Sequence, residues 1–430
     1  MRNKLIPLLQ CALLCLASLH LLFNEDTYGL DIEPDFLYHP IAGLTIVDFC
    51  IFILAFISLF SKATIRHAFA SRLLLGLLAV TLMVAYTNAL FQGNLFGGGQ
   101  GSGLKEIRAV IVMLCLYYVF RRAIVTLPDL LLFHMYFQRL VLVSAGICLA
   151  RFALDINPLS TAATERLTAF EGPMLIWWVF CFSTIAGKVI EKPFGISAWV
   201  WLAIMALAVL FSYRRTPTYM LAIVLTTQLG CCMWSLRRAM YLIAVITAVC
   251  AVVLINRDSW LVSKLNPTTL FDIQSQEYSS NRASNVQHID DIHLGWELAK
   301  KNPFLGVGPG AKLQSPDPLE ELTVDTAIHM QYFNFWLRLG ILGLLLILAY
   351  YGFIFRHITV VIRNVVDTRV RELALGIGGF VIASATVASL VGLNIYGTNK
   401  MQFLSIYIYS AAEILYLHRL KIVSTAQVRL

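Results

Sequence analysis

Charged residues are scarce in this sequence. Aspartate, glutamate, lysine and arginine make up 13% of its 430 residues, whereas hydrophobic residues make up 58%. A soluble domain usually carries about twice that share of charge. A chain of this length cannot bury so much apolar surface in a water-soluble fold, so the composition excludes a soluble protein and indicates a lipid environment.

Cysteine is missing from the one long hydrophilic stretch, residues 256–325, because all nine cysteines lie within or at the ends of apolar runs. This stretch therefore contains no disulfide, and no Cys/His spacing predicts a zinc site. Walker and Rossmann motifs are missing as well. We expect neither a metal nor a cofactor.

The net charge of +8 is carried largely by short loops between apolar runs. In a soluble protein such a charge would raise the question of nucleic acid as a partner. Here it follows the positive-inside pattern of membrane proteins. Basic and aromatic residues are not interleaved as on a nucleic-acid-binding surface, so we expect no nucleic-acid partner.

Apolar runs of about 20 residues, the length that crosses the hydrocarbon core, recur along the chain. They predict an all-α polytopic membrane protein with about 12 transmembrane helices and both termini in the cytoplasm. We expect helices 1–9 in residues 1–255, a large periplasmic loop with short helices in residues 256–325, and helices 10–12 in residues 326–430. The runs begin near Lys4, Ile41, Leu73, Lys105, Leu131, Pro173, Phe194, Pro217, Met240, Thr326, Glu372 and Lys400.

One short turn departs from the charge pattern. By alternation the turn at residues 212–217 faces the periplasm, yet it contains Arg214 and Arg215. An arginine near the membrane costs about 2.5–3.5 kcal/mol on insertion scales, and less near an interface. The two arginines therefore indicate a partner or a ligand. Two alternatives remain open: the side chains reach lipid headgroups, or the spans are miscounted and the turn is cytoplasmic.

The large loop and the span after it hold two further candidates. Residues 289–301 have the apolar spacing of an amphipathic helix, whose apolar face we expect on the membrane or on the spans beneath it. The span at residues 326–355 is about 45 Å long at 1.5 Å per residue, whereas the hydrocarbon core needs about 30 Å. Its first turns should project from the hydrocarbon together with His329. Arg282 lies earlier in the loop.

Arginine and histidine at a membrane surface suit one kind of chemistry. The guanidinium of arginine presents a planar fork of donors that fits a phosphate or diphosphate, and histidine is the usual general base near neutral pH. Arg214, Arg215, Arg282 and His329 therefore predict a lipid-phosphate substrate and a group that loses a proton. Each has a simpler interpretation, namely a solvated loop arginine or an interfacial histidine. His288 and His293 are further candidates.

Four motifs resemble the O-antigen ligase and O-antigen polymerase superfamily. Residues 302–310, Asn-Pro-Phe-Leu-Gly-Val-Gly-Pro-Gly, resemble its signature loop, and His329 followed by Leu-Gly-Ile-Leu-Gly at 339–343 resembles its histidine and the start of a long span. Residues 279–282, Ser-Ser-Asn-Arg, resemble its Ser-Gly-Arg motif, and the turn at 213–216 resembles its Ser-Arg-Gly/Thr turn. The chain departs from the pattern at Met330, where asparagine is frequent, and at Arg338, where an acidic residue is frequent.

The resemblance implies a GT-C-like glycosyltransferase at the periplasmic face of a Gram-negative inner membrane. Its donor would be a glycan on undecaprenyl diphosphate and its acceptor lipid A-core. It would assign Arg215 and Arg282, with Arg214 as the alternative to Arg215, to the diphosphate and His329 to general base. The displacement would invert the anomeric centre without a metal.

Three functions remain open at this point. A ligase transfers the glycan to lipid A-core, and an O-antigen or exopolysaccharide polymerase uses the same donor to extend a chain. A transporter of lipid-linked oligosaccharide is the more distant alternative. Its charges should line a cavity at the bilayer midplane, whereas those here lie at one surface. The order of turn, loop and histidine favours the ligase.

Overall fold

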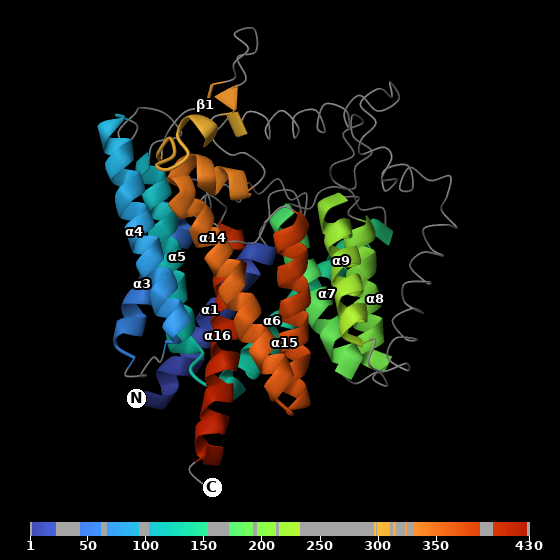
Figure 1. Cartoon of the computed structure of the whole chain (residues 1–430). Coiled ribbons are helices and arrows are strands. Elements are labelled where there is room, and N and C mark those ends of the chain that lie inside the picture. The colour runs from blue at the N-terminus through green and yellow to red at the C-terminus, as the bar shows by residue number, and fades with distance from the viewer. Residues whose placement is uncertain are drawn as a thin grey trace, which may run out of the picture.

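A computed structural model gives the fold as a bundle of long helices (Figure 1). The structure describes part of the chain, namely residues 2–22, 44–61, 67–93, 103–153, 172–191, 196–211, 215–232, 296–297, 299–309, 313–314, 323–324, 331–387 and 399–427. Arg282, His288, His293 and His329 lie outside the described residues.

The described helices coincide with the predicted apolar runs. They are α1 (Arg2–Leu22), α3 (Ile46–Leu59), α4 (Phe69–Phe91), α5 (Gly103–Ala123), α6 (Leu127–Ala153), α7 (Gly172–Glu191), α8 (Ile196–Phe211), α9 (Arg215–Cys232), α14 (Gln331–Asn364), α15 (Thr368–Val387) and α16 (Asn399–Gln427). The run that begins near Met240 lies outside the described residues.

Within the described ranges, five helices are long and apolar enough to cross a membrane, and three shorter helices are also apolar. This confirms a polytopic helical membrane protein. Among the described residues of the predicted loop, a two-residue ladder departs from all-α structure: β1 (Leu313–Gln314) pairs antiparallel with β2 (Thr323–Val324).

Local sequence sets where the helices begin. Thr45 and Asp48 form a capping box at the start of α3, in which Thr45 Oγ1 accepts from the Asp48 amide at 3.2 Å and Asp48 Oδ2 accepts from the Thr45 amide at 2.7 Å. Such reciprocal bonds satisfy amides that have no partner inside the helix. Arg108 of α5 lies 3.3 Å from the same carboxylate, so the cap also ties α3 to α5.

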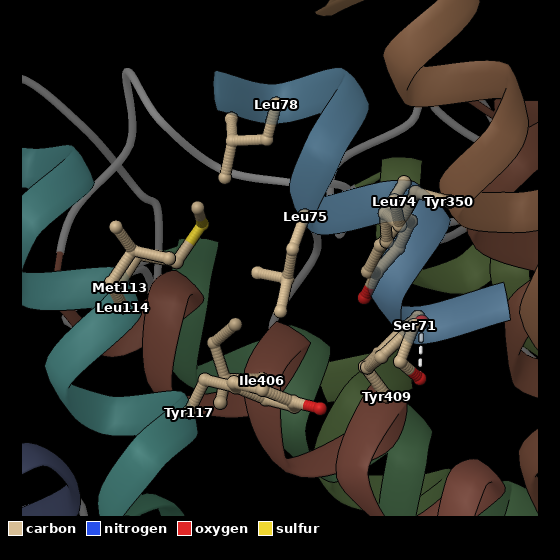
Figure 2. A pocket seen from close by; sticks show the side chains of 10 residues that line it. All are labelled: Ser71, Leu74, Leu75, Leu78, Met113, Leu114, Tyr117, Tyr350, Ile406 and Tyr409. Atoms are coloured by element: carbon tan, nitrogen blue, oxygen red, sulfur yellow. Dashed lines mark hydrogen bonds between the residues drawn. The ribbon is translucent and has the colours of Figure 1, made fainter. Parts of the chain in front are cut away.

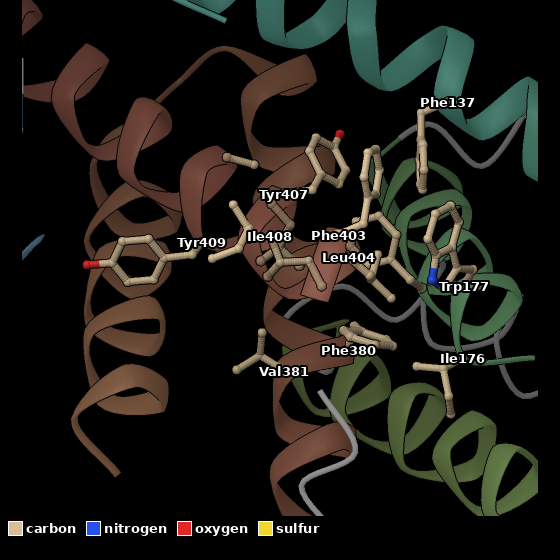
Figure 3. Packing of buried hydrophobic residues seen from close by; sticks show 14 of the residues in the cluster. Phe137, Ile176, Trp177, Phe380, Val381, Phe403, Leu404, Tyr407, Ile408 and Tyr409 are labelled. Atoms are coloured by element: carbon tan, nitrogen blue, oxygen red, sulfur yellow. The ribbon is translucent and has the colours of Figure 1, made fainter. Parts of the chain in front are cut away.

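Aromatic side chains fill the centre of the bundle (Figure 3). Phe137 of α6, Trp177 of α7 and Phe403 and Tyr407 of α16 are all buried, and the rings of Trp177 and Phe403 stack with centroids 5.3 Å apart. Aromatic rings bury large areas and favour such offset or edge contacts. This core fixes α16 against α6 and α7.

Two ends of the bundle can be distinguished. The start of α1 and the end of α16 lie together at one end, and the start of α14 lies at the other with the ladder of β1 and β2 (Figure 1). An ion pair of 3.1 Å between Arg371 of α15 and Glu191 of α7 joins the start of α15 to the end of α7. The end of α7 therefore lies at the opposite end from the start of α14.

Candidate functional site

Helix α14 is broken near its start. Gly340 has φ 67° and ψ −161°, so the helix divides into residues 331–339, called here the half-helix, and a longer segment, residues 341–364. The predicted excess length of this span is thus taken up by a break. At 1.5 Å per residue the longer segment alone covers the hydrocarbon core. The half-helix follows His329 in the chain by two residues.

The loop at residues 302–309, called here the signature loop, caps the end of the half-helix. A helix leaves its last carbonyls without partners inside the helix. At the break, the Val307 amide donates to the Leu337 carbonyl at 2.7 Å and the Gly308 amide donates to the Arg338 carbonyl at 3.1 Å. Two backbone hydrogen bonds from the signature loop therefore hold the end of the half-helix in place.

This close approach requires glycine at residue 340. A Cβ at Gly340 would overlap the Phe304 carbonyl, and its positive φ is one that other residues rarely adopt. On the loop side, Phe304 and Leu305 remain exposed, with 73% and 50% of their surface accessible. The break therefore fits the backbone of the signature loop and leaves its apolar tip on the surface.

Side chains fasten the signature loop on two sides. Asn88, in the last turn of α4, donates from Nδ2 to the Gly306 carbonyl at 3.1 Å, and Trp336 of the half-helix donates from Nε1 to the Pro303 carbonyl at 3.0 Å. Trp296 lies edge-on to Phe333 and Trp336. The described end of the predicted amphipathic helix, residues 296–297 and 299–301, thus packs on the half-helix.

A buried cation stands where the superfamily pattern has an acid. Arg338 is 1% exposed, and its Nε donates to Oδ1 of the buried Asn334 one turn earlier at 3.1 Å. The carbonyl of the same arginine accepts from the signature loop. Arg338 therefore belongs to the junction by both its side chain and its backbone, which sequence reasoning noted only as a departure.

The predicted site residues are placed only in part. Arg215 is the first residue of α9, and its side chain lies outside what the structure describes. Arg214, Arg282 and His329 lie outside it entirely. Helix α7 ends at the opposite end of the bundle from the start of α14, and α8 is antiparallel to α7 (Figure 1). The start of α9, which follows α8, therefore lies at the same end as the half-helix. Helix α15 packs against both α9 and α14.

Sequence reasoning missed a second charged cluster, at the other end of the bundle. Glu413 of α16 is fully buried, and its carboxylate accepts from the Ala68 amide at 2.7 Å and from the Tyr117 hydroxyl at 2.9 Å. Arg121 of α5 lies 3.1 Å from it. A lone glutamate in an apolar run was the available signal, because an intramembrane carboxylate usually has a partner.

The edge of this cluster is more open. His67, just before α4, lies 2.9 Å from the Tyr117 hydroxyl through Nδ1 and 3.9 Å from Glu413. Burial lowers the pKa of the His67 imidazole below its ordinary value, and the Glu413 carboxylate works against that effect. Arg121, 3.1 Å away, is the cationic partner of Glu413 inside the bundle.

A groove between α4, α5, α14 and α16 is lined mainly by apolar side chains (Figure 2). Tyr117, Tyr350 and Tyr409 also line it, and the Tyr409 hydroxyl donates to Ser71 Oγ at 3.0 Å. Ser71 lies in the first turn of α4, whereas Asn88 lies in the last. The groove therefore belongs to the half of the bundle away from the signature loop.

Comparison with known families agrees with the motifs. Residues 200–348 match the family described as O-antigen ligase. The matched segment runs from α8 through the signature loop to the longer segment of α14, so it contains the junction at Gly340. Over these residues the match supports the family that the motifs resemble. No curated protein matches the sequence.

Proposed function

We propose that this chain, a member of the O-antigen ligase family through residues 200–348, transfers a glycan from undecaprenyl diphosphate to lipid A-core at the periplasmic face of a Gram-negative inner membrane. The family supports a glycosyltransferase-like membrane enzyme with lipid-linked glycan substrates. The ligase activity, its donor and its acceptor are the proposal. In this interpretation the chain is GT-C-like, residues 256–325 form the periplasmic loop, and residues 1–255 and 326–430 hold transmembrane helices 1–9 and 10–12.

The observation that carries the proposal is the junction between the signature loop and the half-helix. It holds a short helix at one end of a membrane bundle, with His329 two residues ahead of it in the chain. The start of α9, with Arg215, belongs to the same end. A lipid-linked diphosphate presents its charge at that depth, where arginine and histidine are suitable partners.

The chemistry assigns one task to each residue type. The acceptor hydroxyl attacks the anomeric carbon and loses its proton to His329, while the bond from that carbon to the diphosphate oxygen breaks. Arg215 and Arg282 stabilise the charge that develops on the departing diphosphate, and Arg214 is the alternative to Arg215. One displacement inverts the anomeric centre. Cleavage of the bond between the anomeric carbon and the diphosphate oxygen supplies the driving force, so we propose that neither metal nor nucleotide is needed.

A polymerase with the same donor is the second candidate, because the family includes both activities. His329→Ala in cells separates the alternatives. A ligase variant leaves polymerised glycan on its lipid carrier and lipopolysaccharide uncapped, whereas a polymerase variant leaves single repeat units on the core. A transporter variant would retain the donor in the cytoplasmic leaflet. Continued capping by His329→Ala would remove the assignment of the base or of the function.

The direct test uses purified protein with undecaprenyl-diphosphate-linked glycan and lipid A-core. Wild-type protein is expected to form capped lipopolysaccharide. Arg215→Ala and Arg282→Ala are expected to reduce the transfer rate by roughly a hundredfold or more, the effect of losing one donor to a developing oxyanion. Arg214→Ala identifies which arginine of the pair binds phosphate. Wild-type rates in both variants would refute the diphosphate site.

A further inference from the structure

We propose that the last turn of α4 is a positioning element of the active site. Asn88 and Ala89 hold the signature loop, and the signature loop holds the half-helix that follows the base. This inference rests on the proposed function, because it takes His329 as the group that acts at the start of α14. Asn88 lies outside the segment that matches the family, so the N-terminal helices complete the site.

The contact between α4 and the signature loop is close and polar. Asn88 Nδ2 donates to the Gly306 carbonyl at 3.1 Å, across 218 positions of sequence. Gly308 lies directly on the helix, because a Cβ at Gly308 would stand 3.1 Å from both Cα and Cβ of Ala89. Ala89 is fully buried. The hydrogen bond from the Asn88 side chain and the small side chain of Ala89 therefore fix the distance between α4 and the loop.

The same stretch of the signature loop also reaches the half-helix. Gly306 accepts from α4, and the next two residues, Val307 and Gly308, donate their amides to the carbonyls of Leu337 and Arg338. Any movement of the loop away from α4 therefore acts on the end of the half-helix. A helix as short as residues 331–339 is not stable alone in water, so its orientation depends on these caps together with its packing on the core.

A positioning role predicts a particular kinetic effect. A displacement of about 1 Å can cost roughly a hundredfold in rate even when the altered residue is far from the chemistry. Loss of alignment of the base lowers kcat, whereas binding of the lipid donor through the arginines remains. The acid limb of the pH–rate profile reports the base, so that limb should flatten when the base no longer takes the proton.

The test compares two variants with two controls in the full-length purified protein. Asn88→Leu removes the bond to Gly306 at similar side-chain size, and Ala89→Leu pushes Gly308 off the helix. Asn364→Leu is the matched control for the first, because Asn364 donates from Nδ2 to the Val360 carbonyl of its own helix at 2.7 Å, at the far end of α14 from the signature loop. Ala85→Leu, one turn earlier in α4, controls for a larger buried side chain.

Two measurements are made on each protein. The first is hydrogen exchange of the Val307 and Gly308 amides, which needs no substrate. The second is kcat and KM across pH with undecaprenyl-diphosphate-linked glycan and lipid A-core. Asn88→Leu and Ala89→Leu are expected to raise the exchange rates and to lower kcat roughly tenfold or more, with KM for the donor within about twofold and a flattened acid limb.

Equal exchange and equal kcat in variants and controls would overturn the proposal. If Asn88→Leu does not fold, the isosteric Asn88→Asp replaces it, since its carboxylate cannot donate to Gly306. Inactive wild-type protein would instead refute the proposed function. The exchange data would then still report whether α4 holds the loop, so the two failures are distinguishable.

Discussion

The two ends of the bundle are stabilised by different means. At the end that holds the half-helix, the signature loop and α14 meet through backbone amides and carbonyls at a break that needs glycine. At the other end, the buried carboxylate of Glu413 pairs with Arg121 and accepts hydrogen bonds from Tyr117 and from the backbone at the start of α4. The first arrangement sets a geometry, and the second neutralises a charge.

This difference separates positioning from stability. Backbone caps at Gly340 orient a short segment at the end of the bundle where the proposed site lies. The Glu413 cluster joins α4, α5 and α16 inside the bundle, where a lost partner leaves a buried charge without compensation. Changes at the first end should alter activity more than stability, and changes at the second should do the reverse.

The largest effect on stability is expected from Glu413→Gln. Removal of one partner from a buried ion pair costs about 3–5 kcal/mol, because the other charge stays buried. The thermal midpoint of the purified protein should fall markedly, while kcat of the protein that remains folded stays within about twofold of wild type. A large loss of kcat at unchanged stability would show that the cluster takes part in the reaction.

A double variant sharpens this result. Arg121→Met with Glu413→Leu replaces the pair by apolar groups of similar volume, which is often neutral or stabilising in buried sites. The double variant should therefore recover most of the stability that either single variant loses. Additive losses would mean that the two side chains act separately.

The largest effect on activity from the junction is expected from Gly340→Ala. The added Cβ overlaps the Phe304 carbonyl, and alanine resists the positive φ. The signature loop must move, so kcat should fall by about a hundredfold. Gly352→Ala is the control, because a Cβ at that glycine of the same helix meets nothing within 4 Å. Equal kcat values for the two variants would remove the junction from the mechanism.

A smaller effect is expected from Trp336→Phe. The change keeps an aromatic ring beside Trp296 and removes the bond from Nε1 to the Pro303 carbonyl. A typical hydrogen bond contributes about 1 kcal/mol, so kcat should decrease by roughly fivefold with little change of the thermal midpoint. A fall of the thermal midpoint without a change of kcat would mean that this hydrogen bond stabilises the fold and does not position the site.

No effect is expected from removal of divalent metal. In the proposed mechanism, positioned arginines take the role that a metal ion has in many sugar transferases, so transfer should proceed at the same rate in EDTA as without it. Loss of activity in EDTA with recovery in Mg²⁺ would contradict the assignment of Arg215 and Arg282.

Much of the fold could be predicted from hydropathy, because a membrane helix must satisfy its backbone internally and needs a fixed length. The excess length of the span with His329 also predicted that its start leaves the hydrocarbon. The break at Gly340 could not be placed, since it depends on a backbone contact with Phe304 that no local pattern records. Its two caps join residues about thirty positions apart.

For the charged residues too, part could be interpreted from the sequence and part could not. Arg121 belongs to the basic residues between apolar runs that fit the positive-inside pattern, and the structure buries it beside Glu413. Its partner lies in another helix, so the sequence pattern could not pair them. The motifs around the signature loop predicted the family that residues 200–348 match. The positions of Arg282 and His329 remain predictions.

The central claim is that Arg215, Arg282 and His329 meet at the end of the bundle that holds the half-helix. A structure of the protein with undecaprenyl diphosphate bound tests it directly. The claim predicts phosphate oxygens within about 3 Å of both guanidinium groups, with His329 facing the carbon-bearing side of the diphosphate. The claim would be contradicted by a diphosphate bound at the Glu413 end. It would also be contradicted by a diphosphate bound beside the half-helix without contacts to these three residues.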